Sequence, residues 1–402
     1  MTSESAFITM PKGFQAAGIH CGLKKNSDPD LAFVFSECPA VTAGVYTRNL
    51  VKGHSLVRTI NIIKSYKTCR GILINSGSAN ACIGPAGDLD AEAVATETAA
   101  VFGLKAEEIL TCSTGVIGKR MNVVGMIEGI KTLGSVVSSQ EKSSHDAMKA
   151  IMTTDTVPKE SSAIIEMDGK TVVISGMAKG SGMIHPDLAT MIGVFTTDAD
   201  IDADVLDKLL RNAIKNTFNR VSVDGDTSVC DSVIIMANKM SGVRVMEDTK
   251  EYELFSSALL QISEDLSRMI AADGEGATKL IEVQVSGAAT EEDALLIVRS
   301  ICRSPLCKTA IFGEDANVGR ILTAAGYSGA SFDPGQVDIF IGDLMVCKDG
   351  FVLPFDETYA KEILAQKEIL IIVRLSAGDF SDRMWTCDFS YDYVKINGSY
   401  RS

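Results

Sequence analysis

The sequence predicts a mixed α/β fold with enough length for two or three compact cores. Its 402 residues are 46% hydrophobic and 22% charged, which is the balance of an ordinary globular chain. Residues 1–80 contain short runs of β-branched or alternating apolar residues that turn residues separate, a pattern typical of strands. Residues 202–217 instead repeat apolar side chains along one face of a helix, namely Val205, Leu209, Leu210 and Ile214.

The remaining elements also alternate between the two types. A helix is expected from 89 to 102, with Asp88 as its N-cap and Gly103 as its end. A hairpin is expected around Asp168 and Gly169. Further helices are expected at 121–133, 144–152, 252–272 and 291–300, and strands at 162–166, 170–175, 280–285, 337–341, 369–375 and 379–388.

The charge and hydropathy of the chain exclude several classes of partner. The net charge is −14 and no run of lysine or arginine forms a basic stripe, so neither nucleic acid nor an anionic membrane is an expected partner. No apolar run reaches the length of a membrane span, and residues 1–14 lack the apolar core of a signal peptide. A cytoplasmic location is therefore expected.

The spacing of the cysteines and histidines does not indicate a metal site or a set of disulfides. None of the ten cysteines forms a CxxC pair, and the closest spacing separates Cys302 from Cys307. The four histidines lack ligand-like spacing, and none lies in a motif typical of a Ser-His-Asp triad. The sequence therefore predicts free buried thiols, no metal site and no bound cofactor.

The most informative stretch runs from Lys179 to Ala199. A flexible cationic run, KGSG, precedes a kink at Pro186, and Thr190 then opens an apolar run typical of a buried strand. A threonine hydroxyl needs a base to act as a nucleophile, and cutting the bond before the threonine frees its own α-amine for that purpose. Such an amine titrates at about 7.7–8.0. Taken alone, Thr190 is more typical of a β-forming residue at a strand start than of a nucleophile.

Several strings extend this pattern along the chain. They are NSGSANA from Asn75, STG from Ser113, MTTDTVPK from Met152, KGSGMIHPDLATM from Lys179, FNRVSVDGDTSVCD from Phe218, DGEGATK from Asp273, GEDANVGRI from Gly313 and the tail from Ile396 to Ser402. Together they resemble the glutamate N-acetyltransferase, or ornithine acetyltransferase, family. The resemblance extends from Pro11 to Ser402 and implies a fold in which helices sandwich two mainly antiparallel sheets.

The resemblance also implies a role for individual residues. Thr190 corresponds to the nucleophile, and self-cleavage between Ala189 and Thr190 would give an α chain, 1–189, and a β chain, 190–402. Thr114 and Gly115 correspond to the oxyanion pair. The substrate-binding positions are Thr153, Lys179, Thr190, Glu275, Asn397 and Ser402. Considered without the resemblance, STG is typical of a turn, Lys179 of a solvated loop charge and Glu275 of an exposed loop acid.

The implied activity belongs to arginine biosynthesis. The acetyl group of N-acetyl-L-ornithine would pass through acetyl-threonine to L-glutamate, in an assembly of two α and two β chains. The resemblance leaves open whether acetyl-CoA is also a co-substrate. The chain departs from the family strings at five positions, Ser78, Val229, Cys230, Ala316 and Val318. These departures keep one alternative open, a related acyltransferase or amidohydrolase of the same fold that acts on another N-acyl amino acid. A non-catalytic relative that binds an amino acid without cleaving itself is a second alternative, and the intact nucleophile, oxyanion pair and tail argue against it.

Overall fold

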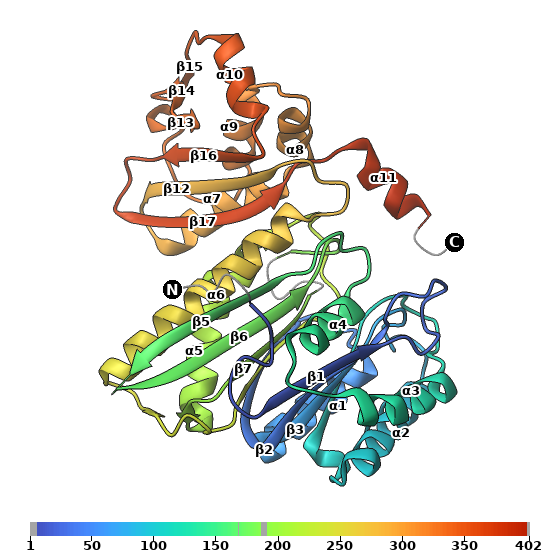
Figure 1. Ribbon diagram of the computed structural model, residues 1–402. Coiled ribbons are helices and arrows are strands. Elements are labelled where there is room, and N and C mark those ends of the chain that lie inside the picture. The colour runs from blue at the N-terminus through green and yellow to red at the C-terminus, as the bar shows by residue number, and fades with distance from the viewer. Residues whose placement is uncertain (1–5, 168, 186–190, 400–402) are drawn as a thin grey trace. The chain divides into compact units, whose positions relative to one another are not determined.

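The computed structural model describes residues 6–167, 169–185 and 191–399, and the chain forms two compact units (Figure 1). The first unit consists of Met1–Gly180, Asp187–Asn219 and Thr227–Leu266. The second consists of Ser181–Pro186, Arg220–Asp226 and Ser267–Ser402. Each unit therefore contains segments from both sides of the predicted cleavage point, so the units do not coincide with the expected α and β chains.

The first unit is built on one large mixed sheet with the strand order β4-β3-β2-β10-β7-β6-β5, and β1 also pairs with β2. Its pairs are antiparallel apart from β3–β4 and β7–β10, among the residues that the structure describes. The strands are β1 (Phe14–Ile19), β2 (Leu31–Tyr46), β3 (Thr68–Asn75), β4 (Ile109–Ser113), β5 (Glu160–Met167), β6 (Lys170–Lys179), β7 (Ile192–Thr197) and β10 (Ser232–Ala237). A short parallel pair, β8 (Asp200–Ile201) and β11 (Arg244–Val245), stands apart from this sheet.

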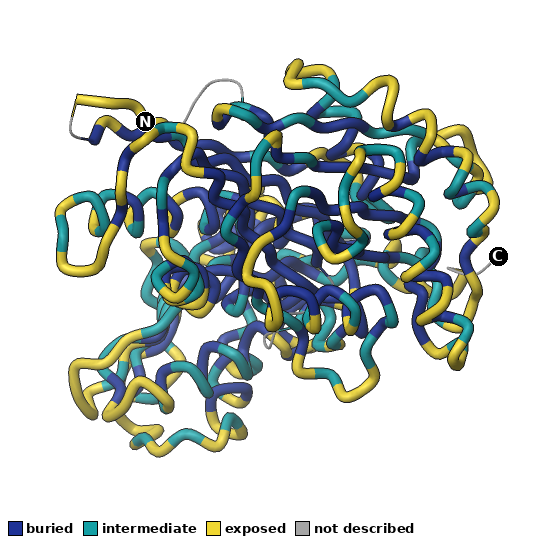
Figure 2. Tube along the Cα trace, turned by 90° about the horizontal axis from the view of Figure 1, so that it is seen from below, coloured by how far each residue is buried: buried dark blue, intermediate teal, exposed yellow. Residues whose placement is uncertain are grey.

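The long strand β2 divides this sheet into two halves. Its register with β3 shifts between Phe35 and Ala40, and the residues before the shift pair with β1 and β3 whereas those near its end pair with β10. One hydrophobic cluster joins Ile72 of β3 to Val194 of β7 and Ile234 of β10. Buried residues of both halves therefore belong to one shared hydrophobic core, and the interior of the molecule is buried (Figure 2).

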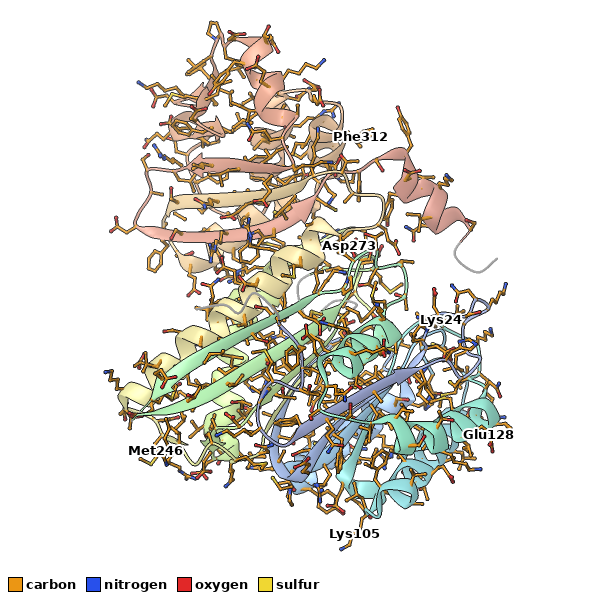
Figure 3. The ribbon with its side chains drawn as sticks, in the orientation of Figure 1. Lys24, Lys105, Glu128, Met246, Asp273 and Phe312 are labelled. Atoms are coloured by element: carbon orange, nitrogen blue, oxygen red, sulfur yellow. The ribbon has the colours of Figure 1, made fainter. Side chains whose placement is uncertain are left out.

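Helices pack against both halves of this sheet. The helices of this unit are α1 (His54–Tyr66), α2 (Ala86–Phe102), α3 (Val123–Val136), α4 (Glu141–Ile151), α5 (Ala203–Asn216) and most of α6 (Lys250–Ala272). Phe33 and Leu73 pack against α2 and α3. In the other half, α6 packs closely against the sheet at Gly176. A methyl group at this position would contact both Phe195 of β7 and Leu266 of α6. The side chains of Lys105 and Glu128 point outward (Figure 3).

The second unit has its own sheet, with the order β15-β14-β13-β16-β12-β17-β9. Ile281, Val283 and Val285 alternate along β12 and pack against Ile297 and Ile301 of α7. The strands are β9 (Val221–Ser222), β12 (Leu280–Ala288), β13 (Asp338–Ile341), β14 (Leu344–Lys348), β15 (Phe351–Val352), β16 (Glu368–Arg374) and β17 (Phe380–Cys387), and the helices are α7 (Glu291–Arg303), α8 (Pro305–Phe312), α9 (Val318–Gly326), α10 (Glu357–Leu364) and α11 (Tyr391–Gly398).

The predicted α/β fold with two mainly antiparallel sheets is confirmed. Gly103 ends α2 in the left-handed conformation, as expected. The prediction that Asp88 caps this helix is wrong, because the helix begins earlier, at Ala86, and the Asp88 carboxylate instead bonds the Nδ1 atom of His54 at 2.8 Å. In the described parts of the chain, no helix has the length and apolar character needed to cross a membrane.

Candidate active site

The ends of several strands of the first unit meet at one place. Lys179, the last residue of β6, pairs with Ile192 at the start of β7, and Ile192 pairs with Ser232 at the start of β10. Strands β3 and β4 end in register at Asn75 and Ser113, directly before Thr114. Although Thr114 follows the other half of the sheet, its hydroxyl oxygen lies 3.5 Å from the ammonium nitrogen of Lys179.

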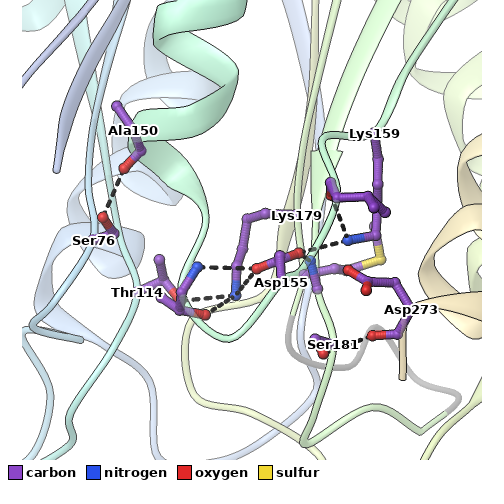
Figure 4. A network of polar contacts seen from close by, with 12 residues as sticks. Ser76, Thr114, Ala150, Asp155, Lys159, Lys179, Ser181 and Asp273 are labelled. Atoms are coloured by element: carbon purple, nitrogen blue, oxygen red, sulfur yellow. Dashed lines mark hydrogen bonds and ion pairs between the residues drawn. The ribbon is translucent and has the colours of Figure 1, made fainter. Parts of the chain in front are cut away.

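Lys179 is the centre of this cluster (Figure 4). Its side chain is only 2% exposed. The ammonium nitrogen donates to the hydroxyl oxygen of Thr153 at 2.9 Å and lies 3.8 Å from Oδ2 of Asp155. The structure therefore brings three of the predicted residues together: Thr114, Thr153 and Lys179. Lys179 is therefore not a solvated charge in a loop, because it is buried at the end of β6.

Asp155 and Lys159 complete the cluster, although the sequence analysis assigned them no role. The Asp155 carboxylate accepts hydrogen bonds from Thr153 N at 3.0 Å, Gly180 N at 2.7 Å and Lys159 Nζ at 2.8 Å. Burial raises the pKa of Asp155, but Lys179 and Lys159 outweigh this effect and hold its pKa well below the usual range. The MTTDTVPK string contained both residues, but their i, i+4 spacing does not reveal that they form a buried ion pair.

The predicted oxyanion pair lies in a tightly packed turn. Thr114 is buried, and its backbone N–H donates to the carbonyl of Asn75 at 2.9 Å. Gly115 has φ = 127°, and a methyl group on it would lie 2.5 Å from the carbonyl carbon of Gly77. Only glycine fits both conditions. The turn is thus held in one conformation, which a site for a developing oxyanion requires.

In the second unit, the structure brings together Glu275 and Asn397. Glu275 is 7% exposed, and its Oε2 atom accepts a hydrogen bond from Asn397 Nδ2 at 2.8 Å. The helix α11 that carries Asn397 is attached by Ser390, whose hydroxyl donates to the carbonyl of Gly276 at 2.5 Å. A methyl group at Gly182 would lie 2.2 Å from Oε2 of Glu275. Glu275 is therefore a buried, positioned carboxylate and not an exposed loop acid.

Three predicted residues, Ala189, Thr190 and Ser402, lie outside the described residues. The strand predicted to follow Thr190 is confirmed, because β7 begins at Ile192 and is buried along its whole length. The position before it, Met191, donates its backbone N–H to Oδ1 of Asp231 at 3.0 Å. Asp231 was not singled out from the sequence, where it appears only as the residue that follows the altered Val229-Cys230 pair.

The five departures from the family strings are accommodated by packing. Ser78 donates its hydroxyl to the carbonyl of Lys119 at 2.8 Å. Cys230 donates its thiol to the carbonyl of Ala79 at 3.2 Å, and Val229 belongs to the same small hydrophobic cluster. The other two, Ala316 and Val318, are buried in the core of the second unit. Each of the five is therefore accounted for by a packing or hydrogen-bond contact of its own.

Comparison with known proteins gives a family match over almost the whole chain. The model of the ArgJ family matches residues 15–402. The chain is 47% identical over 400 residues to the arginine biosynthesis bifunctional protein ArgJ of Caldanaerobacter subterraneus, with 98% of each chain covered. It is 43% identical over 396 residues to the protein of the same name from Bacillus subtilis, with 98% of this chain and 96% of that protein covered.

Two solved structures are also similar. The arginine biosynthesis bifunctional protein ArgJ from Bacillus halodurans is 42% identical, with a TM-score of 0.49 over 50% of this chain and 96% of that chain. The ornithine acetyltransferase from Mycobacterium tuberculosis, in complex with ornithine, is 36% identical, with a TM-score of 0.44 over 46% of this chain and 97% of that chain. The family match and the identity over nearly the full length confirm the resemblance found in the motifs: this chain belongs to the ArgJ family.

Proposed function

We propose that the protein is an acetyltransferase of arginine biosynthesis that moves the acetyl group of N-acetyl-L-ornithine to L-glutamate. The names of its relatives support this activity. The structural observation that best supports the proposed activity is the buried cluster around Lys179. Asp155 is the carboxylate that both Lys159 and Lys179 approach, at 2.8 and 3.8 Å, so these three side chains together have one excess positive charge. That charge suits the carboxylate of an amino-acid substrate.

The nucleophile in this proposal is Thr190, and its base is made by self-cleavage. The Thr190 hydroxyl attacks the carbonyl of Ala189, the acyl group moves from nitrogen to oxygen, and water hydrolyses the ester to leave a free α-amine. The two chains stay together after the cut, because β6 before it pairs with β7 after it, and β2 pairs with β10. Separation would break backbone hydrogen bonds within one sheet.

Acetyl transfer then proceeds in two half-reactions. The Thr190 hydroxyl adds to the acetyl carbonyl while its proton passes to the α-amine. The Thr114 hydroxyl and the Gly115 N–H donate to the resulting oxyanion. The ammonium returns the proton to the departing amine, so ornithine leaves and acetyl-threonine remains. The amine of glutamate attacks this ester by the same route in reverse order, which restores the free hydroxyl.

The substrate contacts are part of the same proposal. We assign the substrate carboxylate to Lys179 with Thr153. Glu275, Asn397 and Ser402 are assigned as substrate-binding residues on the family resemblance alone. The same resemblance supports two α and two β chains per assembly and a cytoplasmic location. The names of the relatives call those proteins bifunctional. For this chain, we propose the acetylation of glutamate from acetyl-CoA as a second use.

An assay with labelled glutamate tests the proposal. Purified protein is incubated with N-acetyl-ornithine and labelled glutamate, and the expected product is labelled N-acetylglutamate in amounts equal to the ornithine released. Thr190→Ala is the inactive control. If acetate appears at a rate that does not depend on glutamate, the protein is an amidohydrolase and the transferase proposal is wrong. A parallel incubation with acetyl-CoA in place of N-acetyl-ornithine tests the second use.

A further inference from the structure

The loop between β1 and β2 carries a lysine, Lys24, to which neither the motifs nor the proposed mechanism assigns a role (Figure 3). The backbone of this loop is fixed by Asp30, which is inaccessible to solvent. Its carboxylate accepts the backbone N–H groups of Cys21, Leu23 and Lys24 at 2.6, 2.8 and 2.9 Å. The position of the Lys24 backbone is therefore set by a buried anchor.

The same loop packs on the turn that carries the proposed oxyanion pair. A methyl group at Gly77 would lie 3.0 Å from the carbonyl oxygen of Leu23. On its other side, Gly77 is the residue whose carbonyl carbon would lie 2.5 Å from a methyl group at Gly115. The residue before Lys24 is thus separated from Gly115 by the thickness of one peptide segment.

The ammonium group of Lys24 lies near the cluster around Lys179 and is not committed to an anion. It is half-buried and donates to the carbonyl oxygen of Pro29 at 2.7 Å, and it forms no ion pair with any residue that the structure describes. Burial lowers the pKa of Lys24, the charge of Lys179 lowers it further, and the charge of Asp155 opposes that effect. Lys24 is therefore within electrostatic range of the cluster.

The two substrates of the proposed reaction place different demands on positive charge. N-acetyl-ornithine has one carboxylate, and its side chain ends in an ammonium group. Glutamate has two carboxylates, and its amine must be uncharged to attack the acetyl ester. The three side chains of Lys159, Lys179 and Asp155 supply one excess positive charge. The attacking form of glutamate therefore lacks a cationic partner for its second carboxylate, whereas N-acetyl-ornithine does not need one.

We propose that Lys24 is a specificity-determining residue for the acceptor, and that its ammonium group binds the carboxylate of glutamate that Lys179 and Thr153 do not hold. This proposal rests on the proposed function, because it requires glutamate to be the acceptor. A hydrogen bond to a carboxylate is stronger than one to a neutral carbonyl, so the ammonium exchanges Pro29 for the substrate. The flexible four-carbon stem of lysine permits this movement.

A purely structural role would not require the charge of Lys24. The backbone N–H, and not the side chain, makes the contact with the buried anchor Asp30. The side chain adds one hydrogen bond to a neutral carbonyl five residues away in the same loop. Lys25, the next residue, is exposed and provides a matched control, since it has the same charge in the same loop.

Steady-state kinetics separate the two half-reactions. In a ping-pong mechanism, kcat/KM for each substrate reports only on the half-reaction in which that substrate takes part. Lys24→Met, Lys24→Arg and Lys25→Met are each purified as the full-length protein, and self-cleavage and the midpoint of thermal unfolding are checked first. The values of kcat/KM for N-acetyl-ornithine and for glutamate are then measured per cleaved chain.

The proposal predicts that Lys24→Met lowers kcat/KM for glutamate at least about fivefold, the effect of losing a half-exposed charged contact. The value for N-acetyl-ornithine should not fall more than about twofold. Lys24→Arg retains the charge and should recover most of the loss, and Lys25→Met should behave like wild type. A smaller loss for glutamate, an equal loss for both substrates, no recovery with arginine or the same loss in Lys25→Met would each overturn the proposal.

The outcome is separable from that of the proposed function. A wild-type protein that transfers no acetyl group to glutamate contradicts the proposed function itself. A wild-type protein that does so, together with a Lys24→Met variant that uses glutamate equally well, contradicts only the assignment of Lys24.

Discussion

The ammonium nitrogen of Lys179 lies 2.9 Å from the hydroxyl oxygen of Thr153. The two residues come from different elements, since Lys179 ends β6 and Thr153 follows α4. Asp155 holds both in place, because its carboxylate accepts the N–H of Thr153 and that of Gly180. The cluster is thus organised by contacts within the protein, which suits the substrate-binding role that we propose for it.

Replacing Lys179 tests the role of its charge. Lys179→Met should lower kcat/KM for N-acetyl-ornithine at least about 30-fold, because a buried charged partner of the substrate is worth about 2 kcal/mol or more. Steady-state kinetics measure the loss. Lys170→Met, at the exposed opposite end of the same strand, is the control and should leave kcat/KM unchanged. Equal losses in both variants would show that the charge of Lys179 has no special role.

The buried carboxylate of Asp155 should matter mainly for stability. Asp155→Asn leaves the ammonium groups of Lys159 and Lys179 without their shared anion, and breaking such a buried pair costs about 3–5 kcal/mol. Urea unfolding measures the change in the free energy of unfolding. Asp146→Asn, whose partner Lys142 is exposed, should change it by less than about 1 kcal/mol. A small effect of Asp155→Asn would mean that the pair contributes little.

The same residue predicts a pH dependence. The folded-state pKa of Asp155 is depressed, so its contribution to stability is fully present above the pKa of an unfolded aspartate, about 3.9, and is lost as the pH falls through the lower folded value. The stability difference between wild type and Asp155→Asn should therefore be constant from pH 7 to about pH 5 and shrink below about pH 4. A difference that shrinks already near pH 6 would contradict the depressed pKa.

Gly182 provides a test of the second cluster. A methyl group there would lie 2.2 Å from Oε2 of Glu275, so Gly182→Ala must displace the carboxylate from Asn397. We expect kcat/KM to fall at least about tenfold, the effect of misplacing a substrate contact. Gly326→Ala, where a methyl group meets no atom within 4 Å, is the control. A fully active Gly182→Ala variant would argue against a substrate role for Glu275.

The sequence was sufficient for part of this description. Gly103 and the apolar face of residues 203–216 predicted helices because capping and periodicity are local properties. The strings around Thr114, Lys179 and Glu275 identified residues that the structure places in buried clusters. These strings combine glycine with a polar residue after a strand or helix, which is a pattern visible in one dimension.

Other features depend on contacts between distant segments. Nothing in the sequence around Asp155 and Lys159 distinguishes them from charged residues on the surface. Their burial depends on the packing of β5 and β6. The length of β2 and the shift in its register between Phe35 and Ala40 become visible only through its pairing with β1, β3 and β10.

The most direct test of the whole account is an intact-mass measurement on protein incubated with N-acetyl-ornithine in the absence of glutamate. The account predicts two chains, and the one that begins at Thr190 should carry the added mass of a single acetyl group that disappears when glutamate is supplied. Thr190→Ala should give one uncleaved, unmodified chain. A wild-type protein that stays intact, or a cleaved protein that transfers acetyl groups without acquiring one at Thr190, would contradict the account.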